Sequence, residues 1–257
     1  KSFFANGRFW VFYIGGGNDL VYSTSQDGAS WVAPTTITAG SVTPSDYSVW
    51  FDGTYMHYAI TPDELSITYR RGTPNNNGSI IWSTSEQIVL NSDVRLPFVC
   101  VDSNGYPWVG YSGYSSGHWH AYVSKSSTND GTWVTDTGFP YQLATDNVND
   151  AYVSIVPLTS GKIYVFYILA SSEARGRLWT GSWGNEEVVN TVAEYEQGAD
   201  YSVVSQGDNI HLIFCQGGTA DLIYRKRTYG VGWGGSFQVQ LGIELNYYEA
   251  PVISINS

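Results

Sequence analysis

Residues 162–183, KIYVFYILASSEARGRLWTGSW, hold the pattern that decides the fold: two strand-like runs, then a tryptophan that follows a polar turn. This tryptophan recurs along the chain at steps of 51, 51, 50 and 50 residues. The series consists of Trp31, Trp82, Trp133, Trp183 and Trp233. A constant step of this length indicates internal repeats, each of which is one supersecondary unit.

Each repeat contains four strand-like segments around its tryptophan. Segments rich in aromatic and β-branched residues predict second strands at 8–14, 54–60, 106–111, 162–168 and 209–215. Third strands are expected at 19–25, 65–71, 119–125, 176–182 and 221–227, and fourth strands at positions such as 34–38, 87–90, 141–143 and 237–241. First strands are expected at 46–53, 95–105, 150–161 and 200–209, and residues 1–7 and 249–257 fit the same slot.

Four strands in about fifty residues predict an all-β, five-bladed β-propeller of four-stranded antiparallel blades, because radial closure protects the sheet edges. A β-sandwich would not repeat so regularly, and a parallel β-helix has a much shorter period. We expect one domain over residues 1–257. Its blades are expected at about 1–40, 41–90, 91–144, 145–193 and 194–242, with an extra first strand at 243–257.

The extra first strand leaves two ways to complete the ring. Either residues 250–257 pair into the blade that contains 8–14, with residues 1–4 displaced or short, or the parent protein continues into another blade. In the second case the chain is a fragment of a larger propeller.

The composition excludes several classes of partner. A formal net charge of -11, from 12 basic and 23 acidic residues, argues against nucleic acids and anionic membranes, which bind clustered Lys and Arg. No run approaches the ~18 apolar residues of a membrane span, so we expect no membrane insertion. Cys100 and Cys215 lie in apolar runs and are expected to be buried free thiols. Few lysines and many Tyr, Trp, Asn, Ser and Thr residues favour an extracellular or cell-surface protein.

Two of the turns before the tryptophans resemble Asp-boxes, the Ser-x-Asp-x-Gly-x-x-Trp signature of bacterial neuraminidase repeats, although both are shorter between Asp and Trp. The matching residues are Ser25, Asp27, Gly28 and Trp31 in one copy, and Thr128, Asp130, Gly131 and Trp133 in the other. In such a turn the carboxylate accepts amide hydrogens, Gly takes a positive φ, and Trp packs under the turn. Asp27 and Asp130 are therefore expected to be structural.

Nearly the whole chain resembles the sialidase-like (BNR-repeat) propeller proteins, through stretches such as VDSNGYPWVGY and VPLTSGKIYVFY. The resemblance implies Asp-box turns between third and fourth strands, opposite the active site. A sialidase also needs three arginines, and the early Arg-Ile-Pro motif is absent. Arg175, Arg225 and Arg227 do not begin a first strand, whereas Arg95 does, so sialidase activity is not expected.

Charged residues recur where first strands begin, which in a propeller is the mouth of the central channel. They are Asp46, Arg95, Asp150, Asp200 and Glu249. Crowded carboxylates shift one another's pKa, so the four acidic members are candidate catalytic residues for glycoside hydrolysis. The alternative is a polar, water-lined channel in which Arg95 neutralises its neighbours.

Loops before the third strands add candidate ligand-binding residues. They are Tyr114, His118, Trp119, Glu173 and Arg175, with Asp63, Glu64, His120 and Asp221 nearby. An aromatic ring flanked by charged groups suits a sugar, whose apolar face stacks while its hydroxyls form hydrogen bonds. The same cluster could equally cap a loop.

No metal or other cofactor is expected. We place His118 and His120 on opposite faces of an extended run, which would prevent a shared metal. Residues 146–150, DNVND, offer oxygen atoms for Ca²⁺ but lack the Gly turn and distal Glu of an EF-hand loop.

Three functions remain open from the sequence. The first is a lectin-like or adhesin propeller that binds a glycan or polysaccharide at the channel mouth through Arg95 and the loop residues. The second is a glycoside hydrolase of sialidase-like fold that uses paired carboxylates. The third is a repeat scaffold without a ligand, since fold does not determine function.

Overall fold

A computed structural model describes residues 1–40, 46–148, 151–169, 173–190, 201–216, 221–241 and 251–254. These residues form β-strands and one short 3-10 helix, Thr159–Gly161. The chain divides into two compact units, one of residues 1–101, 105–114 and 122–141, the other of residues 102–104, 115–121 and 142–257. No helix in the described ranges is long and apolar enough to cross a membrane.

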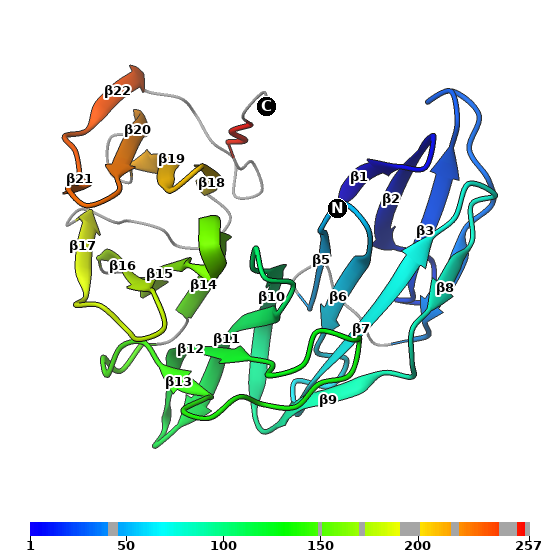
Figure 1. The fold of residues 1–257 in the computed structure, drawn as a ribbon, viewed down its shortest axis with the longest axis horizontal. Coiled ribbons are helices and arrows are strands. Elements are labelled where there is room, and N and C mark those ends of the chain that lie inside the picture. Colours follow the sequence, from blue (N-terminus) through cyan, green and yellow to red (C-terminus); the bar gives the residue numbers. More distant parts are fainter. Residues whose placement is uncertain are drawn as a thin grey trace. The chain divides into compact units, whose positions relative to one another are not determined.

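The strands form five antiparallel sheets (Figure 1). The first sheet is β1 (Ser2–Ala5), β2 (Arg8–Ile14), β3 (Leu20–Ser25) and β4 (Thr35–Thr38). The second is β5 (Tyr47–Phe51), β6 (Met56–Ile60), β7 (Ser66–Pro74) and β8 (Ile80–Trp82), and β9 (Gln87–Asn91) also pairs with β7. The third is β10 (Val94–Val101), β11 (Pro107–Ser115), β12 (His118–Lys125) and β13 (Tyr141–Gln142).

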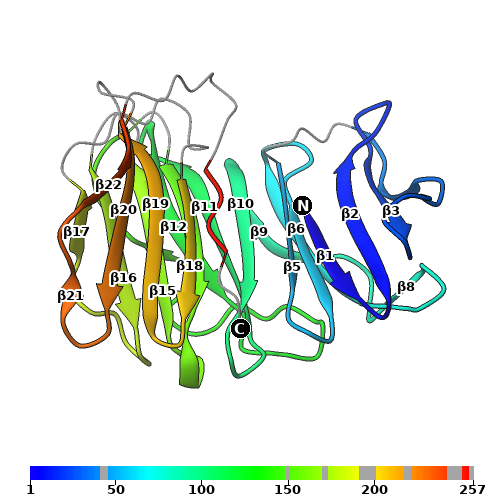
Figure 2. The ribbon, with the colours of Figure 1, turned by 90° about the horizontal axis from the view of Figure 1, so that it is seen from above.

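The last two sheets lie in the second unit. One is β14 (Ala151–Pro157), β15 (Ile163–Leu169), β16 (Ala174–Trp179) and β17 (Glu187–Asn190). The other is β18 (Tyr201–Gln206), β19 (Asn209–Gln216), β20 (Asp221–Thr228) and β21 (Gly232–Trp233), and β22 (Phe237–Gln240) also pairs with β20 (Figure 2). The first three strands of each sheet thus follow in sequence order as the repeat predicts, and the fourth strands expected at 87–90 and 237–241 are β9 and β22, which pair with the third strand beside the short β8 and β21.

Of the extra first strand expected at 243–257, only residues 251–254 are among the described residues. Residues 251–254 lie in no strand, and β1 pairs with β2 in register from Ser2 opposite Val11 to Ala5 opposite Arg8. Residues 1–4 are therefore not displaced from their sheet.

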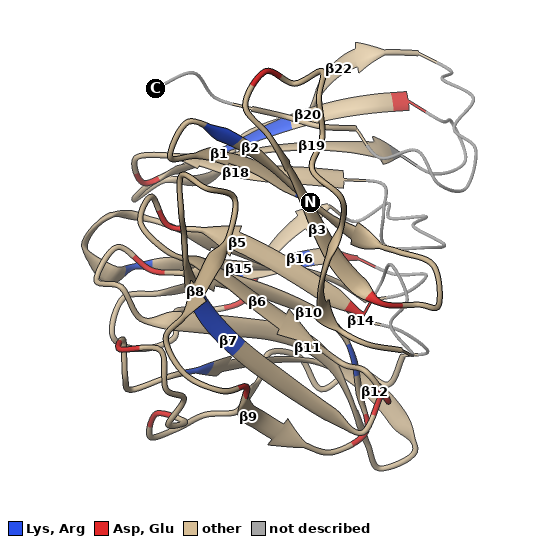
Figure 3. Ribbon diagram, turned by 90° about the vertical axis from the view of Figure 1, so that its right-hand side faces the viewer, with Lys and Arg blue, Asp and Glu red and all other residues tan. Residues whose placement is uncertain are grey.

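The second strands are buried because their aromatic and aliphatic side chains pack between successive sheets. In the second unit one cluster joins β15 to β19 through Tyr164, Phe166, Leu212 and Phe214. In the first unit, Trp10 and Phe12 of β2 share a cluster with Tyr58 of β6. Charged residues mostly occupy turns and strand ends, although β7 and β20 carry basic residues within the strand (Figure 3).

The turn at Asp27 forms the expected hydrogen bonds. Its Oδ1 accepts the amide hydrogens of Ala29 at 2.9 Å and Ser30 at 2.7 Å, and Gly28 has φ +74°. These bonds, the Ser30 amide first, hold the pKa of Asp27 at about 2. The carboxylate therefore stabilises the hairpin between β3 and β4.

A second such turn joins β12 to β13. Asp130 accepts the amide hydrogen of Thr132 at 3.0 Å, and Gly131 has φ +103°. The tryptophans of the two turns differ, because Trp133 is 8% exposed and packs on Tyr69, whereas Trp31 is 45% exposed. Trp133 thus packs under its turn as expected, whereas Trp31 contacts its turn through Nε1, which donates to the carbonyl of Gly28 at 3.3 Å, but is not buried.

One polar pair occurs twice, buried in the first unit and half-buried in the second. Nδ1 of His57 lies 2.8 Å from the hydroxyl of Tyr69, and Nδ1 of His211 lies 2.7 Å from the hydroxyl of Tyr224. The ring planes meet at 31° in both pairs. Each histidine is on a second strand and each tyrosine on the third strand beside it.

The two cysteines match their prediction. Cys100 on β10 and Cys215 on β19 are buried and free of disulfide bonds.

Candidate functional site

Most of the predicted ring of carboxylates lies outside the described residues, namely Asp150, Asp200 and Glu249. Asp46 is described and buried just before β5, and its carbonyl accepts the amide hydrogen of Thr61 at 2.8 Å. Arg95 is half-buried on β10, beside a register irregularity that runs to Phe98. These two positions do not define a catalytic pair.

A denser group of candidates lies in the second unit, where β12 and β16 begin. The turn before β12 places Ser116 at φ 53° and Gly117 at φ 88°, the geometry of a tight two-residue hairpin. The first residues of β12, His118 and Trp119, follow directly, and His118 is exposed. The amide of Trp119 donates to the carbonyl of Val148 at 3.1 Å. The segment before the fourth sheet is thereby fixed against β12.

The expected orientation of the two histidines is wrong. His118 and His120 are two residues apart on one strand, so they lie on the same face, with Trp119 on the other. His120 is buried, with Nδ1 2.9 Å from the carbonyl oxygen of Asp146 and Nε2 3.3 Å from that of Ser115. Both of its ring nitrogens therefore face the backbone, and His120 holds the 146–148 segment in place.

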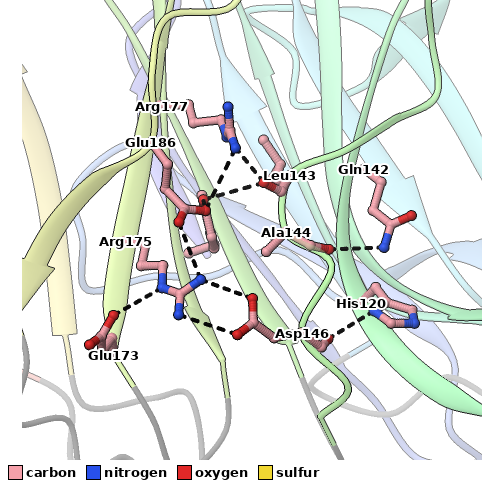
Figure 4. Close-up of polar contacts among 10 residues, drawn as sticks. His120, Gln142, Leu143, Ala144, Asp146, Glu173, Arg175, Arg177 and Glu186 are labelled. Carbon is pink, nitrogen blue, oxygen red and sulfur yellow. Dashed lines mark hydrogen bonds and ion pairs between the residues drawn. The ribbon is translucent and has the colours of Figure 1, made fainter.

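Arg175 on β16 is the centre of an ion-paired cluster (Figure 4). Its Nη1 donates to Oδ2 of Asp146 at 2.9 Å and its Nη2 to Oδ1 at 3.3 Å. Its Nε donates to Glu173 at 3.1 Å, and Nη1 also donates to Glu186 at 3.2 Å. Burial lowers the pKa of Arg175, but the bonds to Asp146 and the charge of Glu186 outweigh it and raise the pKa overall.

Arg177 and Tyr167 extend this cluster toward the interior. Nε of Arg177 donates to the carbonyl of Leu143 at 3.1 Å, and Nη2 lies 3.8 Å from Glu186. The hydroxyl of Tyr167 donates to Glu186 at 2.5 Å. Burial, and then this bond, raise the pKa of Tyr167, which stays protonated. Glu186 is thereby held by two arginines and a tyrosine.

We name this set the Arg175 cluster. It consists of His120, Asp146, Tyr167, Glu173, Arg175, Arg177 and Glu186. Three carboxylates face two guanidinium groups, so the cluster has a net charge of about one negative unit at neutral pH. Sequence reasoning found His120, Glu173 and Arg175 but missed Glu186, Arg177 and Tyr167, because ion pairs across strands follow no period.

Residues 146–150, whose oxygen atoms could serve Ca²⁺, are described in part. Both carboxylate oxygens of Asp146 bond to Arg175, and residues 149 and 150 lie outside the described chain. Within the described ranges, no group of three acidic, His or Cys side chains is placed to hold a metal ion.

The remaining loop candidates are not members of the Arg175 cluster, and each has other contacts or a turn conformation. Tyr114 is exposed, and its amide donates to the carbonyl of Asp93 at 2.9 Å. Asp63 caps its own turn by accepting the amide hydrogen of Leu65 at 3.0 Å. Glu64 follows Asp63 at φ 57°. Asp221 accepts a hydrogen bond from Gln238 at 2.7 Å.

Comparison with known proteins gives a fold. No protein-family model and no curated protein matches the chain. Among solved structures, the fungal lectin of Aleuria aurantia, described as a six-bladed β-propeller with a fucose recognition mode, is 12% identical with a TM-score of 0.61. The match covers 95% of this chain and 78% of the lectin.

Two further structures are similar. AofleA from Arthrobotrys oligospora is 13% identical with a TM-score of 0.64, over 98% of this chain and 73% of that one. An ulvan lyase of polysaccharide lyase family PL25, bound to a GlcA(1-4)Rha3S polymer, is 13% identical with a TM-score of 0.58, over 96% and 71%. At these identities the similarities show a shared β-propeller fold and nothing further.

Proposed function

We propose that this protein is a carbohydrate-recognising β-propeller of the lectin kind, and that each of its five sheets is one blade. The observation that carries the proposal is the match of 95% of the chain to the fold of a fucose-recognising lectin. The lyase neighbour also has a polysaccharide as its ligand, so two similar structures engage sugars.

We place the glycan at the start of β12 and β16, beside the Arg175 cluster. His118 is exposed there, and Trp119 is half-buried on the opposite face of β12. The neighbouring segment, residues 146–148, is held in place by three contacts. The amide of Trp119 donates to Val148, and Asp146 contacts both His120 and Arg175. A site prepared in this way loses little conformational entropy when a sugar binds.

Catalysis is the second candidate, and it has less support. Of the four carboxylates that the sequence suggests, Asp46 alone lies within the described residues, and it is buried. The carboxylates of the Arg175 cluster each form an ion pair with Arg175 and are not arranged as an acid and nucleophile pair about an open cleft. Binding without turnover therefore agrees better with this geometry.

A glycan array followed by titration calorimetry tests the proposal. We expect His118→Ala to weaken binding of the selected glycan by at least about ten-fold, since its contacts would be lost, and Trp119→Ala, on the opposite face of β12, to have a smaller effect. Phe237→Ala is the matched control, because Phe237 is an exposed aromatic on β22 of the same unit. An array without any bound glycan would refute the proposal, and release of shortened products would favour the enzyme.

A further inference from the structure

Every guanidinium nitrogen of the Arg175 cluster is directed at an oxygen of the protein. The three nitrogens of Arg175 bond to Glu173, Asp146 and Glu186. Nε and Nη1 of Arg177 donate to the carbonyls of Leu143 and Gly184, and its Nη2 approaches Glu186. Most N–H groups of Arg175 are thus used within the protein, which leaves it little capacity to bind an incoming carboxylate or sulfate.

At this cluster the carboxylate side chains are more exposed to solvent than the Arg175 side chain. The side chains of Asp146 and Glu173 are 42% and 36% exposed, whereas that of Arg175 is 17% exposed. Glu186 is more enclosed and bonds to Tyr167. The carboxylates of Asp146 and Glu173 thus form the exposed edge of the cluster, and the lone pairs that Arg175 does not use can accept hydrogen bonds from donors in solution.

Sugars differ in what they offer to such an edge. A neutral sugar carries hydroxyl groups that donate to carboxylates, and these charge-assisted bonds are short and strong. A uronate, sialic acid or sulfated sugar brings a second negative charge to within a few ångströms of Asp146 and Glu173. The net charge of -11 on the whole chain adds a repulsion that slows the approach of any polyanion.

We propose that the Arg175 cluster is a specificity device that selects uncharged sugars and rejects anionic ones, with Asp146 and Glu173 as the hydroxyl acceptors. The inference rests on the proposed glycan-binding function and adds the ligand class. Arg175 acts here as a positioning residue that fixes both carboxylates. The three carboxylate partners of Arg175 and its low exposure disfavour recognition of an anion by Arg175 itself.

The test uses the full chain and two matched panels of glycans, one neutral and one bearing uronate or sulfate groups. We expect binding to the neutral panel with little dependence on salt, because no ion pair forms with the ligand. Binding to the anionic panel should be weaker by at least about ten-fold.

Charge-removing variants show which residues discriminate. Asp146→Asn and Glu173→Gln should each weaken neutral binding by about three- to ten-fold, because an amide oxygen is a weaker acceptor than a carboxylate. The same variants should reduce the difference in affinity between the neutral and the anionic glycans. Asp93→Asn is the control for net charge, since Asp93 is exposed and lies in the other unit. Urea unfolding midpoints check that each variant is folded.

The outcomes separate the two proposals. Tight, salt-sensitive binding of anionic glycans by the unmodified chain would overturn the selectivity while leaving glycan recognition standing. Neutral binding that neither Asp146→Asn nor Glu173→Gln alters would also overturn it. Absence of binding to both panels would refute the proposed function itself.

Discussion

Arg227 and Glu187 form a two-bonded ion pair that links β20 to β17. Nε of Arg227 donates to Oε2 of Glu187 at 2.7 Å, and Nη2 donates to Oε1 at 2.6 Å. The Arg227 side chain is only 5% exposed and that of Glu187 is 28% exposed. The guanidinium carbon also lies 4.9 Å from the centre of the Tyr164 ring. The pair therefore fastens the last sheet to its predecessor within the second unit.

Removing the acidic partner should destabilise the fold substantially. Glu187→Gln leaves Arg227 buried without its counter-charge, and we expect the free energy of unfolding to fall by about 2–4 kcal/mol. Urea denaturation followed by tryptophan fluorescence measures the change. Glu173→Gln is the control, because Glu173 also pairs with an arginine but is more exposed, and its loss should cost less than about 1 kcal/mol. Equal losses of unfolding free energy in the two variants would show that burial of the arginine partner does not determine the cost.

Removing both partners should cost less than the sum of the single changes. Combining Glu187→Gln with Arg227→Met leaves no buried charge, and the two residues share one interaction. A double-mutant cycle should therefore show a coupling of at least about 1 kcal/mol. Additive effects in that cycle would show that the ion pair contributes nothing of its own.

Two tryptophans at equivalent repeat positions should tolerate substitution differently. Trp133→Ala empties a buried site against Tyr69 and should lower the free energy of unfolding by about 3–5 kcal/mol. Trp31→Ala removes a side chain that is nearly half exposed, so about 1–2 kcal/mol is expected. Chemical denaturation of the two variants measures both losses of unfolding free energy. A larger loss for Trp31→Ala than for Trp133→Ala would contradict the burial that we assign to the two side chains.

The Asp52, His57 and Tyr69 chain should make the protein sensitive to mild acid. Burial lowers the pKa of His57 below its ordinary 6.5, although the bond to Asp52 opposes this. His57 is therefore neutral when folded and gains a proton on unfolding, so stability falls as the pH drops through 6.5. His57→Gln should flatten the dependence of the unfolding free energy on pH between about 7 and 5. If His57→Gln left the slope of unfolding free energy against pH unchanged, His57 would not be the group that takes up a proton on unfolding.

The carboxylate of Asp52 should affect the stability of the fold at lower pH than His57 does. Burial raises its pKa, but hydrogen bonds from His57 and from the amides of Tyr55 and Thr54 outweigh burial, and the pKa is lowered overall. Its contribution is present above the ordinary value of 3.8 and is lost as the pH falls through the folded value. Asp52→Asn should therefore differ from the parent at neutral pH and approach it in strong acid, as measured by thermal melting.

The turn at Asp27 offers a test that titration can read directly. Because the amides of Ser30 and Ala29 favour the ionised form, NMR titration of the side-chain carboxyl should give a midpoint of about 2. The melting temperature of Asp27→Asn should lie below that of the parent at pH above 3.8, and the difference should shrink as the pH approaches the folded value. A midpoint near 3.8 would show that the turn does not form as described.

The sequence was sufficient to predict the strand order, because a period near fifty residues and the aromatic second strands depend on local pattern alone. It was insufficient for the burial of Trp31, which depends on what packs beside the turn and not on the repeat. It was also insufficient for the partners of Arg175. Asp146 and Glu186 lie 29 and 11 residues away along the chain, and only the folded strands bring them together.

Within the predicted site, the error over His118 and His120 was one of geometry. Residues two apart on a strand share a face, so that strand assignment alone places both rings on one side. The burial of His120 could not be inferred in the same way. It depends on the carbonyls of Ser115 and Asp146, the second of which lies 26 residues further along the chain.

The paired His57 with Tyr69 and His211 with Tyr224 have the same ring angle at equivalent strand positions. Polar pairs of this kind are not required by a sheet, since apolar residues fill most of the neighbouring positions. The two sheets thus share a polar side-chain contact between second and third strand as well as their strand order, and this contact is fully enclosed in one sheet and reached by solvent in the other.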